Sequence, residues 1–436
     1  MFKRRVTSCF GCLLVALLGL MHVAQAHASA TLLLEEPYGR LGAFTGQGHA
    51  AVYLDRVCAK TPLVLRRCRD GEAGVVISRY NRVGGYDWVA IPLIPYLYAV
   101  ESRDDIPLFA DQKLVAFLRD QYRRKHLESI APDVEGGEMP VGNWTQLVGS
   151  AYDRTSYGYE IETSETRDDE LIEVLNAQSN RTHYWTFSSN CADFAKEIIN
   201  FYYPRALHRN FLADAAITTP KQISKSMVKF AKRHPELDFS SYVIPQVPGS
   251  TPRSTPVRGV IESLVKTKKY LVPLAYLQPV VTASLALVYM GNGRFDPVRD
   301  PMVLNSGRGL KPPLAADERR TYQSQLQELL SRTNPELNSS RNLKEWGRVQ
   351  ANAVPELDEE GRPALQLRVG EEVFELGVSR SNILTNTAPA ELAQQLVAAR
   401  LEEELKRSPV PKASRADVIS DWKLLQQLLP TEASLN

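Results

Sequence analysis

Short apolar runs separated by Gly, Pro and Asp fill the chain between residues 31 and 93. They lie at residues 50–57, 63–67, 75–80 and 88–93, and Val, Ile, Leu and Tyr are frequent in them. Runs of this length that are bounded by turn residues are typical of β-strands. The pattern therefore predicts an antiparallel meander that starts near Thr31.

Helical spacing of apolar positions appears further along the chain. In residues 111–126 apolar side chains recur three and four positions apart, at Leu114, Phe117, Leu118 and Tyr122. This spacing predicts an amphipathic helix. A shorter helical pattern covers residues 169–177.

The same pattern divides the chain into an α+β domain at residues 31–240 and a smaller α+β region at residues 310–436. Residues 241–269 between them are expected to form a linker, because residues 245–256 are rich in Pro, Ser, Thr and Gly. In the last region residues 364–378 alternate like a hairpin. Helical spacing recurs there at residues 317–330, 392–405 and 418–429.

Residues 270–290, from Tyr270 to Met290, carry no charged side chain. This length of 21 residues reaches the roughly 20 that a membrane span needs, but Pro273, Gln278 and Pro279 interrupt the run. Three lysines precede the run on the side that an exported chain presents outside the cytoplasm, whereas positive residues prefer the inside. The segment is thus either a membrane span or a buried or membrane-resting helix.

The N-terminus has the order of a secretory signal peptide. Basic residues at positions 3–5 precede an apolar stretch at 12–21, and an A-x-A sequence follows at 24–26. We expect residues 1–26 to be removed without lipidation of Cys12. The rest of the chain is then exported to the periplasm or another extracytoplasmic compartment.

Charge and composition exclude several classes of site. Removing residues 1–26 takes three of the 52 Lys and Arg and none of the 50 Asp and Glu, so the remaining chain is nearly neutral. Nucleic-acid-binding domains usually carry a net basic charge. The sequence also lacks a nucleotide-binding loop, a metal-spaced cluster of His and Cys, and an internal repeat. We therefore expect no nucleic acid, cofactor or metal.

Three cysteines follow the signal peptide, and they cannot all pair within one chain. Cys58 and Cys68 flank a segment that bends at Thr61-Pro62, a spacing that fits a disulfide across a hairpin. Cys191 is then the unpaired thiol.

Cys191 stands at an expected helix start. Asn190 is a favoured N-cap residue and Asp193 can complete a capping box, so a helix should begin directly after Asn190 and end before Pro204. Amides and the helix dipole at this end favour an anion and lower a thiol pKa. The position predicts a nucleophile, although a cysteine followed by apolar residues is also common in a hydrophobic core.

His49 is the expected base for this thiol, since imidazole is the usual partner of a nucleophilic cysteine. It follows the glycines at 46 and 48 and enters a predicted strand, where a side chain is held rigidly. His183, eight residues before Cys191, is the second choice. A structural role for His49 is the simpler alternative.

Together the two motifs resemble a known family. A G-x-G-H sequence at residues 46–49, followed later by N-C-x-x-F at 190–194, is similar to the circularly permuted NlpC-type branch of the papain-like cysteine hydrolases and acyltransferases. Relatives of lecithin retinol acyltransferase belong to this branch. The exported setting further resembles the periplasmic domain of bacterial lipoprotein N-acyltransferases. The likeness covers about residues 31–205.

This resemblance implies a permuted papain-like domain, with an antiparallel sheet packed on helices. It makes Cys191 the nucleophile and His49 the base. A third polar group normally orients the imidazole from a neighbouring strand, and Ser78 and Asn81 are the candidates, although both are also typical turn residues. The backbone amide of Cys191 is expected to bind the oxyanion.

Two functions of different classes follow. The first is an exported amide or ester hydrolase or acyltransferase that uses the Cys191–His49 pair on an envelope peptide, a lipoprotein or a lipid acyl chain, with membrane contact through residues 270–290. The second is a non-catalytic envelope binding or scaffold protein that keeps the papain-like shape. In that case Cys191 is buried, or is paired to Cys58 or Cys68.

Overall fold

The structure is a computed structural model, and its described residues are 29–39, 46–81, 83–181, 184–247, 254–297, 302–303, 349, 352–379 and 381–382. Several expected features lie outside these residues. They are the signal peptide, His183, and the helices expected at 317–330, 392–405 and 418–429.

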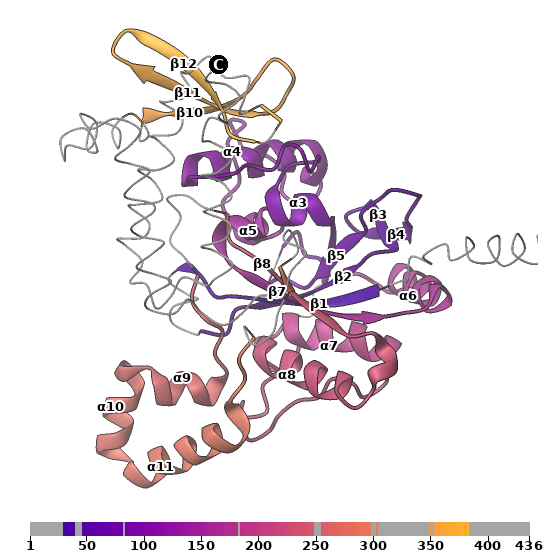
Figure 1. The fold of residues 1–436 in the computed structure, drawn as a ribbon, viewed down its shortest axis with the longest axis vertical. Helices are drawn as coiled ribbons and strands as arrows, with labels where there is room; N and C mark the ends of the chain where they lie inside the picture. The colour runs from indigo at the N-terminus through magenta and orange to yellow at the C-terminus, as the bar shows by residue number, and fades with distance from the viewer. Residues whose placement is uncertain are drawn as a thin grey trace, which may run out of the picture.

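A seven-stranded sheet forms the centre of the fold (Figure 1). β1 (Ser29–Glu35) pairs antiparallel with β2 (His49–Leu54) on one side and with β7 (Ser156–Glu162) on the other. The sheet continues outward from β2 through β5 (Val75–Ser78) and β6 (Val89–Pro92). Beyond β7 it continues through β8 (Ser240–Ile244) and β9 (Met302–Val303), the latter pairing parallel to β8.

Helices cover both faces of this sheet (Figure 1). On one face lie α3 (Leu93–Tyr98), α4 (Gln112–Tyr122) and α5 (Ser150–Asp153). On the other lie α7 (Cys191–Tyr202) and α8 (Pro220–Ala231), with α6 (Glu165–Ala177) at the edge beside β4. The expected mixed α+β fold with an antiparallel sheet is confirmed.

β1 is buried along its whole length because it lies between these two layers. Leu33 points into the core under α3 and α4, whereas Leu32 and Leu34 point into the core under α7 and α8. Each of the three leucines is 0% exposed. Because both faces of β1 are buried, apolar residues follow one another at its centre instead of alternating with polar ones.

The expected meander is interrupted. β3 (Val57–Thr61) and β4 (Val64–Arg67) form a separate two-stranded hairpin, and β2 pairs with β5 directly. β7 was not expected, because Gly158 and three glutamate or serine positions weaken its pattern. Glycine is required at position 158 because a Cβ there would lie 2.3 Å from the ring of Tyr242 on β8.

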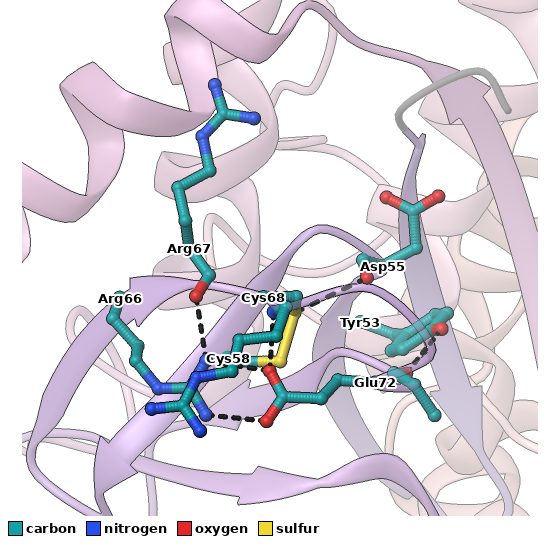
Figure 2. The surroundings of a disulfide bond; sticks show 9 residues. Tyr53, Asp55, Cys58, Arg66, Arg67, Cys68 and Glu72 are labelled. Carbon is teal, nitrogen blue, oxygen red and sulfur yellow. Dashed lines mark hydrogen bonds and ion pairs between the residues drawn. A yellow bond between two sulfur atoms is a disulfide. The ribbon is translucent and has the colours of Figure 1, made fainter. Parts of the chain in front are cut away.

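The disulfide across this hairpin is confirmed. Cys58 and Cys68 are joined, and the guanidinium of Arg66 donates two hydrogen bonds of 2.7 Å to the carboxylate of Glu72 beside them (Figure 2). Cys191 is the free cysteine of the described residues. The alternative in which Cys191 pairs with Cys58 or Cys68 is therefore wrong.

The helix starts follow local capping. The side chain of Asp111 accepts a hydrogen bond from the amide of Leu114 at 2.8 Å, which starts α4 inside the expected range. α7 spans Cys191–Tyr202 as expected. Short irregular helices complete this part of the chain: η1 (Arg123–Leu127), η2 (Asn143–Gln146), η3 (Pro235–Leu237) and η4 (Tyr289–Gly293).

The range 241–269 is more structured than a linker. Residues 241–244 belong to β8 in the central sheet, and α9 (Val260–Lys266) occupies the other end of the range. The hairpin expected at 364–378 is confirmed by β11 (Pro363–Val369) and β12 (Glu372–Gly377), and β10 (Val354–Leu357) adds a third strand. Leu365, Leu367 and Leu376 share a core with α4, so this small sheet packs on the central fold.

Residues 270–290 form two helices, α10 (Lys268–Leu277) and α11 (Pro279–Val288), joined at Gln278. Neither helix contains a buried residue, so the interpretation as a buried helix is wrong. Within the part of the chain that the structure describes, no helix has the length and apolar character of a membrane span.

Replacing both Cys58 and Cys68 by serine should lower the free energy of unfolding by about 3 kcal/mol. The reason is that the disulfide closes a short loop in the unfolded chain, with a sequence separation of 10. Urea denaturation at equal protein concentration measures the change. Reduced wild-type protein is the control and should match the double variant; equal midpoints for the oxidised wild type and the variant would contradict the expectation.

Candidate functional site

The N-terminus of α7 is fixed by the side chain of Asn190. Its oxygen accepts hydrogen bonds from the amides of Ala192 (2.8 Å) and Asp193 (3.0 Å), and Asp193 completes the capping box. Its amide group donates to the carbonyl oxygens of Thr186 and Thr218, each at 3.0 Å. One side chain therefore ties the helix start to two neighbouring loops.

Asp193 strengthens the same end. Its Oδ1 accepts hydrogen bonds from Thr218 Oγ1 (2.5 Å) and Arg209 Nη2 (2.8 Å), and Lys196 Nζ lies 3.2 Å away. Burial raises the pKa of this carboxyl, but these partners outweigh burial and hold the pKa below its ordinary value. Asp193 is therefore a charged structural residue that holds the helix start.

The Cys191 thiol lies against the first residues of β2. The backbones of Ala192, on its own helix, and of Ala50, the residue after His49, are near enough to the thiol to lower its pKa. The residue is 9% exposed, and its thiol is buried. The structure thus brings the expected nucleophile to the strand end that carries the expected base.

Gly48 explains why β2 can begin with His49 at this point. Gly48 has φ +70°, and a Cβ on it would lie 2.1 Å from the carbonyl oxygen of Glu35 on β1. Only glycine fits this left-handed conformation and this close approach. His49 then pairs with Glu35 across the sheet, and 7% of the histidine is exposed.

Ser78 orients the imidazole. Its Oγ lies 2.6 Å from His49 Nε2, and its hydroxyl donates to the carbonyl oxygen of Ala50 at 3.2 Å. With its single hydroxyl proton directed to Ala50, Ser78 can only accept from His49, and this arrangement assigns the imidazole proton to Nε2. Nδ1 is then the nitrogen that can accept a proton.

The ring of Tyr80 fixes the plane of the imidazole. The two rings stack with centroids 4.6 Å apart and planes 17° apart. Tyr80 is itself held by a hydrogen bond of 3.0 Å from its hydroxyl to the carbonyl oxygen of Gln146. Ser78 and Tyr80 therefore restrict both the direction and the tilt of His49.

A buried ion pair lies beside the site. Arg154 Nη1 is 3.2 Å from Glu35 Oε2, and the two side chains are 3% and 0% exposed. The Tyr96 hydroxyl donates to Glu35 Oε1 at 2.8 Å, and the Arg154 guanidinium lies over the Tyr38 ring at 4.5 Å. The charge of Arg154 acts on both His49 and Cys191.

These surroundings keep the resting pair neutral. Burial raises the pKa of the Cys191 thiol to about 11, although the hydrogen bonds of Ala50 and Ala192 and the charge of Arg154 oppose the shift. Burial and Arg154 hold the pKa of His49 well below its ordinary value. The expectation of a lowered thiol pKa is wrong, because burial outweighs the helix terminus.

The other described histidines are engaged elsewhere. The rings of His126, His208 and His234 contact Glu101, Ser226 and Glu236, respectively, at 2.8 Å. Of the two candidates for the orienting group, Ser78 reaches His49. Asn81 is an exposed turn residue whose carbonyl oxygen accepts from Asn143 at 3.1 Å.

Arg79 links the end of β5 to the loop before α7. It donates to Ser189 Oγ at 3.1 Å, pairs with Asp87 at 2.6 Å and lies 4.9 Å over the ring of Phe194. Arg79, Glu35 and Arg154 were not identified from the sequence. Two glutamates, Glu35 and Glu36, at the end of an apolar strand could have indicated a buried acidic site. Arg79 and Arg154 have no comparable signal in the sequence, because their roles depend on tertiary contacts.

A metal ion requires at least three ligand atoms close to one another. In the described residues such a group consists of Cys58, Cys68 and Glu72. Its two sulfurs are joined in the disulfide (Figure 2). This group therefore offers no thiolate ligands while the disulfide is intact.

No protein-family model, curated protein or solved structure gives a significant match to this chain. The junction of β2, β5 and α7 holds a free thiol and an oriented imidazole, and Arg154, which follows α5, acts on both through its charge. These are the groups needed for nucleophilic attack on a carbonyl carbon with general-base assistance.

The alkylation rate of Cys191 by iodoacetamide should be low at pH 7 and rise about tenfold per pH unit toward pH 10. The thiolate is the reactive form, and a pKa of about 11 leaves little of it at neutral pH. Intact mass spectrometry measures the rate. An unstructured cysteine peptide, whose rate levels off above about pH 9, is the control; a plateau for Cys191 near pH 7 would show a preformed thiolate instead.

Proposed function

We propose that this protein is an exported cysteine-dependent amide or ester hydrolase or acyltransferase with a permuted papain-like domain. The observation that carries the proposal is the position of Cys191 at the capped start of α7, next to the backbone of Ala50. Ala50 directly follows His49 on β2, and the His49 imidazole lies 2.6 Å from Ser78 Oγ. The histidine strand precedes the cysteine helix in the chain, and the orienting serine comes from the neighbouring strand β5. Both features support the permuted arrangement.

Catalysis begins from neutral groups. As Cys191 Sγ attacks a carbonyl carbon, His49 Nδ1 takes the thiol proton, and the carbonyl oxygen becomes an oxyanion. The backbone amide of Cys191 at the helix start is the proposed donor to that oxyanion. Proton transfer in the course of attack avoids an isolated thiolate, which burial disfavours.

The second half of the reaction uses the same groups in reverse. The tetrahedral intermediate collapses when the carbon bond to the leaving amine or alcohol breaks, and the imidazolium of His49 gives that group its proton. An acyl thioester remains on Cys191. Water or an acceptor amine then loses a proton to His49 and attacks the thioester, which frees the thiol.

Export defines the substrate class of the proposal. The signal-like N-terminus predicts an extracytoplasmic location, and the Cys58–Cys68 disulfide supports an oxidising compartment. Envelope peptides, lipoproteins and lipid acyl chains carry the amide or ester bonds that such a thiol attacks. These are the proposed substrates.

The burial of Cys191 favours a second candidate function. A 9% exposed cysteine with a pKa raised to about 11 is also compatible with a non-catalytic envelope scaffold of the same shape. In a scaffold the hydrogen bond between His49 and Ser78 would serve only to satisfy a buried imidazole. Covalent trapping separates the two functions.

Incubation with an activated acyl ester should add one acyl mass to the wild-type protein, in a bond that hydroxylamine cleaves. Cys191→Ala should add none. His49→Gln should slow acylation about 10²- to 10⁴-fold, because the general base is lost. Intact mass spectrometry after brief mixing measures each rate; equal labelling of wild type and Cys191→Ala would contradict the proposed enzyme.

Ser78→Ala should slow acylation by roughly 10- to 100-fold, the range seen when the partner that orients a functional histidine is removed. Ser78→Thr keeps the hydroxyl and should retain most of the rate. The acylation rate of each variant is also measured as a function of pH. Loss of the hydrogen bond to Ser78 should change the pH profile of the alanine variant and not that of the threonine variant. If the alanine and threonine variants behave alike, Ser78 has no positioning role.

A further inference from the structure

α10 and α11 lie at one end of the molecule (Figure 1), and several of their large apolar side chains are exposed. The largest exposed fractions lie where the two helices meet: Tyr276 is 87% exposed, Val280 77% and Leu277 68%. Further along, Val272 and Leu287 are 63% and 65% exposed. Single exposed apolar residues are common on proteins, but a contiguous group of this kind marks an interaction site.

Two hydroxyls and one backbone amide near the tip of the α10–α11 hairpin are bonded within the hairpin itself. The hydroxyls of Thr282 and Ser284 donate to the carbonyl oxygens of Gln278 and Val280, at 3.0 Å and 2.9 Å. The amide of Gln278 donates to the carbonyl oxygen of Leu274 at 2.8 Å, and Pro279 has no N–H. Internal bonding of this kind is what a hydrocarbon environment requires and water does not.

The charged side chains on the hairpin itself are basic, whereas the acidic residues Glu262 and Asp296 lie just outside it, at its base. Residues 268–295 contain Lys268, Lys269 and Arg294 and no Asp or Glu. All three basic residues are exposed, at the base of the hairpin and away from its tip. An apolar tip with a cationic base complements a bilayer that has anionic head groups.

The length of the hairpin limits how deeply it can insert. α10 and α11 have 10 residues each. At 1.5 Å per residue each helix is about 15 Å long, against a hydrocarbon core of about 30 Å. The hairpin can therefore rest in one leaflet.

The base of the hairpin is attached firmly to the body. Glu262 of α9 pairs with the buried Lys221 of α8 at 2.6 Å, and the Tyr289 hydroxyl after α11 donates to the same carboxylate at 3.1 Å. The amide of Val260 donates to Asp214 at 2.8 Å. A surface that holds the hairpin therefore also orients the body.

We propose that the α10–α11 hairpin is a peripheral docking element for an anionic lipid bilayer, with its apolar tip in one leaflet and Lys268 and Lys269 at the head groups. This inference is independent of the proposed enzymatic function. It predicts that Cys191→Ala binds the same lipid surface as the wild type.

Flotation with vesicles tests the proposal on the purified protein. Wild type should float with vesicles that contain phosphatidylglycerol and bind at least about tenfold more weakly to pure phosphatidylcholine. The triple variant Tyr276→Ser, Leu277→Ser, Val280→Ser should lose at least about tenfold in affinity for the anionic vesicles. Lys268→Gln with Lys269→Gln should weaken binding in low salt, with a smaller effect at about 0.5 M salt.

A matched control removes exposed apolar side chains elsewhere. Val354 and Val373 on β10 and β12 are 53% and 49% exposed, and they lie at the opposite end of the molecule in Figure 1. Replacing both by serine should leave flotation unchanged, and circular dichroism checks that every variant is folded. A wild type that floats with neither vesicle overturns the proposal. So does a triple variant that floats as well as wild type, or one that only changes from dimer to monomer, which would identify a self-association surface.

Discussion

The side chain of Asn190 is the constraint on which the geometry of the site depends. It accepts from two amides of α7 and donates to two loop carbonyls, so the helix start, the loop before it and the segment before α8 meet at one residue. Because α7 begins directly after it, the Cys191 thiol can lie only where the first turn meets β2. A capping interaction usually stabilises a helix by about 1 kcal/mol. Here it also determines the position of Cys191 Sγ.

The burial that fixes the positions of the Cys191 thiol and the His49 imidazole also disfavours the charged form of each group. Burial raises the pKa of Cys191 and lowers that of His49, and Arg154 lowers the pKa of both groups. A buried cation therefore favours the thiolate and disfavours the imidazolium. Both groups are accordingly neutral at rest, and in the proposed reaction charge separates only while the proton moves between them. Glu35 faces His49 across β1 and β2 and forms an ion pair with Arg154, so it offsets part of the Arg154 charge.

Features set by local sequence were predicted well. The capping box of α7, the disulfide hairpin and the pairing of β11 with β12 each depend on residues close in the chain. β7 was not predicted because its glycine, Gly158, is required by contact with the ring of Tyr242 on β8, more than 80 positions away in the chain. Residues 270–290 form two helices because Pro279 interrupts the run, and the sequence shows this proline directly. The sequence does not show that α10 and α11 are both without buried residues.

The electrostatics of the site depend on distant contacts. Ser78 and Asn81 were equal candidates in sequence, and strand register decides between them, because the pairing of β2 with β5 brings Ser78 to His49. Glu35 and Arg154 meet only through packing of β1 against the segment after α5. The thiol pKa was predicted in the wrong direction for the same reason: helix position is a local property, whereas burial is a property of the whole fold.

The most direct test of the paired thiol and imidazole is the tautomer of His49, measured by ¹⁵N NMR on protein labelled at histidine. The account expects a proton on Nε2, an unprotonated Nδ1 at neutral pH, and a shift of the Nδ1 resonance when Cys191 is replaced by alanine. A proton on Nδ1, or an Nδ1 resonance that does not change when the thiol is removed, would contradict it.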